Sequence, residues 1–271
     1  MKIYDCFMYW DEDLLLDLRM NILNKVVDYF VIVEGNKTWQ NNKKKFKFKI
    51  EKFKKFRKKI IYIKVSDLPN GKNPWIRENF QRNCISRGLQ KAREEDLIMI
   101  SDLDEIPNPS VIKLFKATMR YAVFQQKLYY YKLNLQSETD PLWLGTRICI
   151  KKYLKSPQWL RELKFKKRPF WRIDKLRLNN IIDEGGWHFC NLKKPDLLLY
   201  KYQNLCETND PINFKEKIDK KFLDINEISK RIELGDDIIG RKDNFSKVEL
   251  DNSFPNYLLE NREKYHEWIQ L

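Results

Sequence analysis

The first 101 residues alternate short apolar runs with amphipathic segments, and this alternation constrains the fold more than any other feature. Four runs have the composition of buried strands: Ile3–Phe7, Asp28–Gly35, Ile60–Val65 and Asp96–Ser101. Two segments carry apolar residues at helical spacing: Glu12–Val26 and Pro74–Arg93. Strands that alternate with helices predict an α/β fold, with a mainly parallel central sheet flanked by helices. Ligands then bind at the carboxyl ends of the strands.

The rest of the chain is less regular. The pattern predicts a helix from Pro109 to Met119 and then a long strand over residues 121–135. From Pro211 the chain is polar with helical spacing, and a last helix is predicted over Pro255–Ile269. No internal repeat and no linker rich in Pro, Gly or Ser occurs, so we expect a single domain over residues 1–271.

The most informative short stretch is "DLIMISDLDEIP", where a hydrophobic run leads directly into Asp102, Asp104 and Glu105. Like charges this close raise each other's pKa values unless a cation offsets them. If the chain stays extended, Asp102 and Asp104 point to one face, because side chains alternate along a strand. Two convergent carboxylates suit a hard divalent cation such as Mg²⁺ or Mn²⁺. The alternative is a solvated turn in which Glu105 caps the next helix.

The formal net charge of +15 favours an acidic partner such as nucleic acid, nucleotide phosphates or an anionic membrane. Residues 43–59 concentrate this charge, with eleven basic residues and one acid. Phe46 and Phe48 alternate, and Phe53 and Phe56 stand at helical spacing, which predicts an amphipathic element with a solvated lysine face. The alternative is a docking patch for an anionic membrane or a polyanionic glycan. Because no nucleic-acid-binding motif occurs, we expect no nucleic-acid partner.

Cysteine and histidine content limits the possible sites and settings. The five cysteines form no C-x-x-C pair, which fits a reducing setting. The chain begins with a strand-like run, and no apolar run approaches 20 residues. We therefore expect no signal peptide, no transmembrane segment and a cytoplasmic protein that contacts membranes at most peripherally. With only His188 and His266, a site built on several histidine ligands is excluded.

Six ordered blocks resemble family 17 glycosyltransferases, which belong to the GT-A class, and the resemblance covers nearly the whole chain. The blocks are "YDCFMYWDEDLLLDLRMNIL", "VVDYFVIVEGNKTW", "NPWIRENFQRN", "DLIMISDLDEIP", "GGWHF" and "IELGDDIIGR". The resemblance implies a GT-A-like domain that uses Mn²⁺ or Mg²⁺. It also implies transfer of a sugar, with inversion, from UDP-N-acetylglucosamine to a glycan acceptor. Residues 1–107 would form the nucleotide-binding half, and residues 108–271 the acceptor-side half with the C-terminal helices.

The same resemblance assigns candidate roles around the nucleotide. An acid that ends the second strand commonly faces the nucleoside in this class, and basic or amide groups of the helix before the fourth strand often point toward the nucleotide. The candidates here, together with Asp102, are Glu34, Asn36, Arg77, Arg82 and Asn83. Alternatively, Glu34 is a solvated strand-end acid and Arg82 an ordinary surface charge.

The stretch "DEGGWHFCNL", residues 183–192, is a second candidate for chemistry. Inverting transfer requires a general base, for which Asp183 and Glu184 are candidates; Glu184 is preferred because it adjoins a glycine pair. His188 could join Asp102 and Asp104 as a metal ligand, or contact the diphosphate, or serve only as a structural hydrogen-bonding residue.

Two other functions compete with a glycosyltransferase. A nucleotidyltransferase on a similar sheet would also use paired carboxylates and a metal, but such enzymes usually carry a glycine-rich basic loop after the first strand. Here the acidic sequence "FMYWDED" follows that strand, without glycine. A basic nucleic-acid-binding protein would explain the net charge and the Phe residues among the lysines, but the aromatic residues of 46–56 are expected to face the core.

Overall fold

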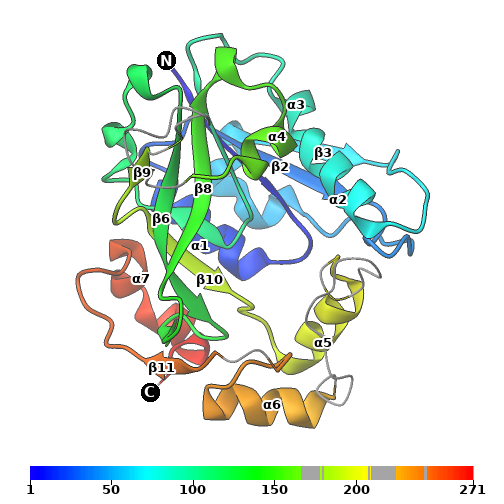
Figure 1. Cartoon of the computed structure of the whole chain (residues 1–271), viewed down its shortest axis with the longest axis vertical. Coiled ribbons are helices and arrows are strands. Elements are labelled where there is room, and N and C mark those ends of the chain that lie inside the picture. Colours follow the sequence, from blue (N-terminus) through cyan, green and yellow to red (C-terminus); the bar gives the residue numbers. More distant parts are fainter. Residues whose placement is uncertain (166–177, 179, 207, 209–223, 241–242, 271) are drawn as a thin grey trace, which may run out of the picture.

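The computed structural model describes residues 1–165, 178, 180–206, 208, 224–240 and 243–270. Its centre is an 11-stranded sheet in which strands from both halves of the chain take part (Figure 1). The main path of this sheet runs β11-β7-β6-β8-β4-β1-β2-β3. The α/β class expected from the sequence is confirmed.

The four strands predicted in the first half are all present and parallel: β1 (Ile3–Met8), β2 (Tyr29–Gly35), β3 (Ile60–Val65) and β4 (Leu97–Ser101). β1 lies between β4 and β2, so the loops that follow β1 and β4 emerge at the same edge of the sheet. β4 is buried at every position. This explains its unbroken apolar sequence, because parallel sheets are covered on both faces.

Helices cover the two faces of these strands separately. On one face, α1 (Asp13–Leu23) packs its leucines against Phe7, Phe30 and Ile32. On the other face, α2 (Pro74–Asn83), α3 (Ile85–Gly88) and α4 (Pro157–Glu162) pack against a second core that contains Val31 and Val33. α2 begins where predicted, since the Asn73 side chain accepts a hydrogen bond from the backbone N–H of Trp75 and Pro74 occupies the first turn.

The second half makes the sheet mixed. β8 (Leu142–Ile150) is antiparallel to both β4 and β6 (Tyr121–Tyr130). The remaining strands are β5 (Glu105–Pro107), β7 (Leu135–Ser137), β9 (Ile181–Ile182), β10 (Gly186–Cys190) and β11 (Phe245–Lys247). β10 runs parallel to β6 and antiparallel to β5. The expectation of a parallel sheet therefore holds for β1 to β4 but not for the whole sheet.

Helices of the second half are short. Besides α4, the α-helices described there are α5 (Pro195–Asn204), α6 (Ile225–Leu234) and α7 (Asn256–Glu260). The 3₁₀-helices of the whole described chain are η1 (Ile50–Lys59), η2 (Ile112–Leu114), η3 (Ala117–Met119), η4 (Lys151–Tyr153) and η7 (Arg262–Trp268). α5 and α6 lie beside each other at one end of the molecule (Figure 1). No helix in the described ranges is both long and apolar enough to cross a membrane.

Several predicted element boundaries were wrong for local backbone reasons. The helix predicted after Pro109 forms only η2 and η3, because Phe115 is extended between them. The strand predicted to reach residue 135 ends at Tyr130, since Tyr131 adopts the left-handed conformation with φ of 61° and reverses the chain into β7. The last helix is divided at Asn261, and the helix predicted to continue from Gly88 to Arg93 stops at Gly88. The helical segment predicted from Pro211 is confirmed where α6 forms, and its part up to residue 223 lies outside the described residues.

The basic segment of residues 43–59 is amphipathic, as predicted. Phe48, Phe53 and Phe56 are buried in the core, and the rings of Phe48 and Phe53 stack with centroids 5.7 Å apart. The lysines of η1 mostly face outward. The alternative role of this segment in docking to membranes or glycans stays a prediction.

A buried ion pair between Asp5 of β1 and Arg19 of α1 connects the sheet to the loop after β4. Both side chains have no solvent exposure, and they form two hydrogen bonds of 2.6 and 2.7 Å. The remaining donors of Arg19 reach the Ser101 hydroxyl at 2.6 Å and three backbone carbonyls, those of Asp102, Leu103 and Glu105, at 3.2, 3.0 and 2.8 Å. Arg19 therefore fixes the backbone path of the loop after β4, residues 102–105, which is called the acidic loop below.

We predict that Arg19→Met lowers the free energy of unfolding by about 3–5 kcal/mol, because Asp5 is left buried without a counter-charge. Chemical denaturation measures this loss. The matched control is Arg87→Met, which breaks the exposed pair with Asp67 and should cost less than about 1 kcal/mol. Equal losses in the two variants would contradict the assigned importance of the buried pair. The double variant Asp5→Leu with Arg19→Met should recover part of the loss, since no buried charge remains.

Candidate active site

A cavity of about 300 Å³ opens at the carboxyl ends of β1 and β4, the edge at which the sheet topology predicts a ligand site. The loop after β1 contributes Trp10 and Glu12, and the loop after β4 contributes residues 102–105. Further lining residues come from α2, β8, α4, the end of β10 and α5: Glu78, Arg82, Trp143, Arg161, His188, Cys190, Lys193 and Lys201. The cavity therefore collects charged and aromatic side chains from both halves of the chain.

Two arginines neutralise the first carboxylate of the D-x-D sequence. Arg161 Nη2 lies 2.8 Å from one oxygen of Asp102, and Arg82 Nη2 lies 3.2 Å from the other. Burial opposes ionisation of this carboxyl, but Arg161 and Arg82 outweigh that effect and lower the pKa of Asp102. Both oxygens of Asp102 thus face guanidinium groups.

Glu105 is fully buried and serves as an internal anchor instead of the helix cap that the sequence left open. Its carboxylate accepts hydrogen bonds from Arg161 at 2.7 and 2.8 Å, from the indole N–H of Trp143 at 2.6 Å, and from the backbone N–H of Asp102 at 3.1 Å. Glu105 lies in β5, which pairs with β10. The third acid of the cluster therefore positions Arg161 and Trp143 around the cavity.

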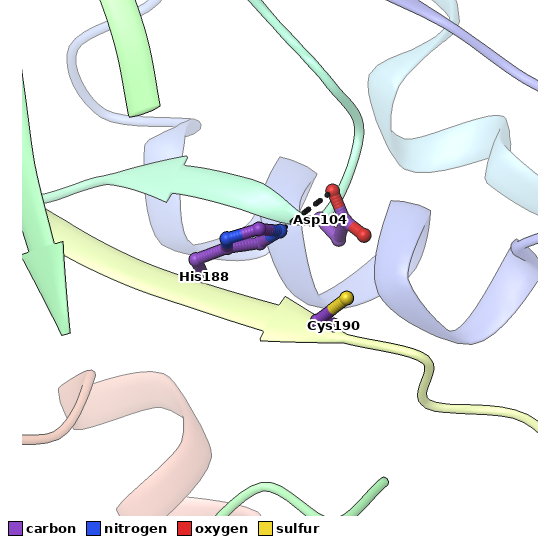
Figure 2. Close-up of side chains that lie close together, drawn as sticks. All are labelled: Asp104, His188 and Cys190. Carbon is purple, nitrogen blue, oxygen red and sulfur yellow. Dashed lines mark ion pairs between the residues drawn. The ribbon is translucent and has the colours of Figure 1, made fainter. Parts of the chain in front are cut away.

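Asp104 points instead toward β10, where it meets His188 and Cys190 (Figure 2). The distance from Asp104 Oδ1 to His188 Nε2 is 3.5 Å, and the potential ligand atoms of the three residues all lie within 4.8 Å of one another. The backbone N–H of Phe189 donates to the carbonyl of Asp104 at 3.0 Å, which fixes the two segments side by side. Burial alone would lower the pKa of His188, but the neighbouring Asp104 and Cys190 raise it well above its usual value.

The donor set of this cluster fits a divalent cation. A carboxylate and an imidazole together suit Mn²⁺ and other transition metals better than Mg²⁺, which prefers oxygen ligands. The buried Nδ1 of His188 has no hydrogen-bond partner among the described residues. Of the three predicted metal ligands, the structure brings together Asp104 and His188, whereas Asp102 is paired with arginines.

Apart from Asp102, Arg82 is the one nucleotide-binding candidate among the described residues that line the cavity. Asn83 is exposed outside the cavity, where its side-chain oxygen accepts a hydrogen bond from the backbone N–H of Gln158 at 3.0 Å. Arg77 is buried and donates to the carbonyls of Trp39 and Gly71, both at 2.6 Å. Arg77 therefore connects two loops and does not reach the cavity.

Glu34 and Asn36 are also absent from the described residues that line the cavity. The Glu34 carboxylate has no exposure and accepts four hydrogen bonds: from Lys44 Nζ, the Tyr62 hydroxyl, and the backbone N–H groups of Lys47 and Phe48. Its observed role is to anchor the basic segment to β2. This position does not support the contact with a nucleoside that the resemblance implied for Glu34.

Asp183 and Glu184 occupy an exposed turn between β9 and β10, away from the described cavity lining. The glycines beside them serve strand packing. A Cβ at Gly185 would lie 2.7 Å from the backbone N of Gln125, and one at Gly186 would lie 2.1 Å from the carbonyl of Ile106. The structure therefore gives no support for either acid as the general base.

Several cavity residues could not be found from the sequence. Arg161 lies 56 positions from Glu105, and the only local signal, Ser156 and Pro157, marks the start of α4. Trp10 follows β1, and its ring lies 5.5 Å from that of Trp39. Their presence in the cavity depends on the tertiary fold.

Residues 1–269, nearly the whole chain, match the sequence model of Glycosyltransferase family 17. The chain belongs to this family. The human and rat proteins named beta-1,4-mannosyl-glycoprotein 4-beta-N-acetylglucosaminyltransferase are each 24% identical to it, over 282 and 281 residues. These matches cover 93% of the chain but only 52% and 51% of the relatives, so the chain spans about half of their length. The expectation of a family 17 glycosyltransferase is confirmed.

The pair formed by Glu12 and Lys193 should make stability depend on pH. Burial opposes ionisation of Glu12, but Lys193 and two backbone N–H groups lower its pKa from 4.5 to about 2. Because the pKa is lower in the folded state, the stabilisation is complete above pH 4.5 and is lost as the pH falls toward 2. We predict that Glu12→Gln has a lower free energy of unfolding than the parent protein above pH 4.5. This difference between the two proteins should shrink as the pH falls toward 2.

Urea denaturation at a series of pH values measures that difference. Glu51→Gln, at an exposed position of η1, controls for the loss of one negative charge. A difference between parent and Glu12→Gln that stays constant as the pH falls would contradict the assigned pairing with Lys193.

Proposed function

We propose that this chain is a divalent-metal-dependent inverting glycosyltransferase that transfers N-acetylglucosamine from a UDP-sugar to a glycan acceptor. The single observation that carries this proposal is the meeting of Asp104 and His188 at the wall of the cavity. Family membership supports the reaction class, and the names of the curated relatives support the sugar. The metal and the UDP portion of the donor are inferred from the chemistry of the site.

The proposed cation would be held by the Asp104 carboxylate and the His188 imidazole. When bound, such an ion stabilises the negative charge that grows on a leaving diphosphate. Arg82 lies on the neighbouring wall, and its buried Nε has no hydrogen-bond partner in the described structure. Its terminal nitrogens donate to Gln158, Glu78 and Asp102, at 2.6, 2.7 and 3.2 Å, so this guanidinium would supply positive charge beside the phosphates rather than free terminal donors. All of these groups stand on or next to β4, β10 and α2, so they are held rigidly before any ligand binds.

Arg161 has a different proposed role from Arg82. Its terminal nitrogens donate to Asp102, to Glu105 and to the carbonyl of Gly145, at 2.7 to 3.1 Å. It therefore orients the loop after β4. By neutralising Asp102 it also lowers the negative charge that an incoming diphosphate meets.

Trp143 offers an apolar surface for a sugar ring at the mouth of the cavity. Trp143 is 41% exposed although its indole N–H is fixed by the buried Glu105. An aromatic side chain with one end bonded inside and one wet face suits a contact surface. We assign this face to the donor or acceptor sugar.

We predict that Asp104→Asn removes the Mn²⁺-dependent part of UDP binding. Mutations of groups that only support a metal ligand cost about 10- to 100-fold in affinity, so the loss of a ligand should cost at least that much. Calorimetry of UDP with and without Mn²⁺ measures the effect. Asp67→Asn, at an exposed pair with Arg87, is the control. An undiminished Mn²⁺ effect in Asp104→Asn would overturn the assignment.

The same assay extended to other ligands separates the competing functions. UDP-sugars should raise the melting temperature of the parent protein more than nucleoside triphosphates do, and Mn²⁺ should increase the difference. A stronger response to nucleoside triphosphates would favour a nucleotidyltransferase.

The position of Glu184 gives a prediction about the general base. Removal of a general base typically costs about 10²- to 10⁴-fold in rate. Because Glu184 lies outside the cavity lining, we predict that Glu184→Gln transfers sugar at close to the parental single-turnover rate. A loss of 10²-fold or more, at unchanged UDP affinity, would establish Glu184 as the base and would require this turn to move to the cavity.

A further inference from the structure

We propose that Cys190 is a third protein ligand of the cation at Asp104 and His188, so that the site prefers Mn²⁺, Co²⁺ or Zn²⁺ to Mg²⁺. This inference rests on the proposed metal dependence and deepens it. It names a ligand type that the carboxylate pair of the D-x-D sequence does not predict.

The geometry of β10 places the thiol at the site. His188 and Cys190 are two positions apart on one strand, so their side chains leave the same face. Figure 2 shows that this face is turned toward Asp104. The thiol sulfur, the imidazole and the carboxylate form a group whose ligand atoms lie within 4.8 Å of one another. A cation placed among them could be bound by all three after small side-chain rotations.

Cys190 differs in its surroundings from the three cysteines of the core, and unlike Cys206, which also lines the cavity, it belongs to the cluster with Asp104 and His188. Cys6, Cys84 and Cys149 are buried in the apolar core between the sheet and α2, α3 and α4, where burial raises the pKa of each thiol. Such thiols are inert packing groups. Cys190 is only partly buried, lines the cavity and stands beside an imidazole and a carboxylate.

The pairing of Asp102 with two arginines explains why the thiol matters. With both oxygens of Asp102 facing guanidiniums, Asp104 is the carboxylate of the D-x-D sequence that remains for a cation. Magnesium ions bind through oxygen ligands, whereas imidazole and thiolate favour transition metals. Binding of the ion replaces the thiol proton by a metal–sulfur bond and releases that proton to solvent, so binding strengthens as the pH rises.

The test uses Co²⁺ as a spectroscopic probe of the full chain. A cobalt–thiolate bond gives a near-ultraviolet charge-transfer band, which is absent when only oxygen and nitrogen ligate the ion. We expect this band in the parent protein with Co²⁺ and UDP, and its loss in Cys190→Ser. We also expect Cys190→Ser to weaken Co²⁺ binding by about 10- to 100-fold with little change for Mg²⁺. Cys84→Ala, which removes a core thiol, should keep the band.

The outcomes distinguish this inference from the proposed function. Co²⁺ binding by the parent protein without a sulfur band would overturn the role of Cys190 and leave a metal-dependent transferase intact. A band that survives in Cys190→Ser would also overturn it. If the parent binds no divalent cation with UDP, both the thiol ligand and the proposed metal dependence are contradicted. The parent spectrum alone decides the question if Cys190→Ser fails to fold.

Discussion

The buried pair of Asp5 and Arg19 is the interaction on which the arrangement of this site depends. Its ion pair fixes α1 against β1, and its remaining donors hold the Ser101 hydroxyl and three carbonyls of the loop after β4. Removing two charges from water is costly, and only a complete set of hydrogen bonds offsets that cost. The Ser101 hydroxyl and the backbone carbonyls of the acidic loop complete the hydrogen bonds of the Arg19 guanidinium. The backbone of this loop is thereby held by one buried side chain.

The loop fixed in this way gives its three acids three different partners. Asp102 meets Arg82 and Arg161, Glu105 is buried with Arg161 and Trp143, and Asp104 reaches His188 across the pairing of β5 and β10. The repulsion expected within the acidic cluster is therefore offset by arginines at Asp102 and Glu105 and by the imidazole of His188 at Asp104. We infer that a bound cation replaces the proton of this imidazole and takes over that role at Asp104. Because Asp104 is the one carboxylate of the loop that remains for a cation, other side chains must supply further ligands to that ion. The proposed thiol ligand, Cys190, is one of them.

The sequence predicted the parts of the fold that local patterns determine. The four parallel strands follow from continuous apolar runs, and the position of the acidic loop follows from the strand before it. Patterns could not show that Glu34 bonds to Lys44 and Tyr62, because that pairing arises from the packing of the basic segment against β2 and β3. Nor could they show that Arg161 returns to the loop after β4. The glycine pair beside Glu184 is required by the close approach of β10 to β5 and β6, so its presence does not mark Glu184 as a base.

We infer that Asp104 and His188 bind a cation at the wall of a cavity that holds UDP. The decisive measurement is a crystal structure of the full chain with UDP and Mn²⁺, with anomalous diffraction recorded near the manganese absorption edge. We expect an anomalous peak within bonding distance of Asp104 and His188, with the diphosphate between that peak and Arg82. A manganese ion bound through Asp102 with the arginines displaced, or UDP bound without any manganese peak at Asp104, would contradict it.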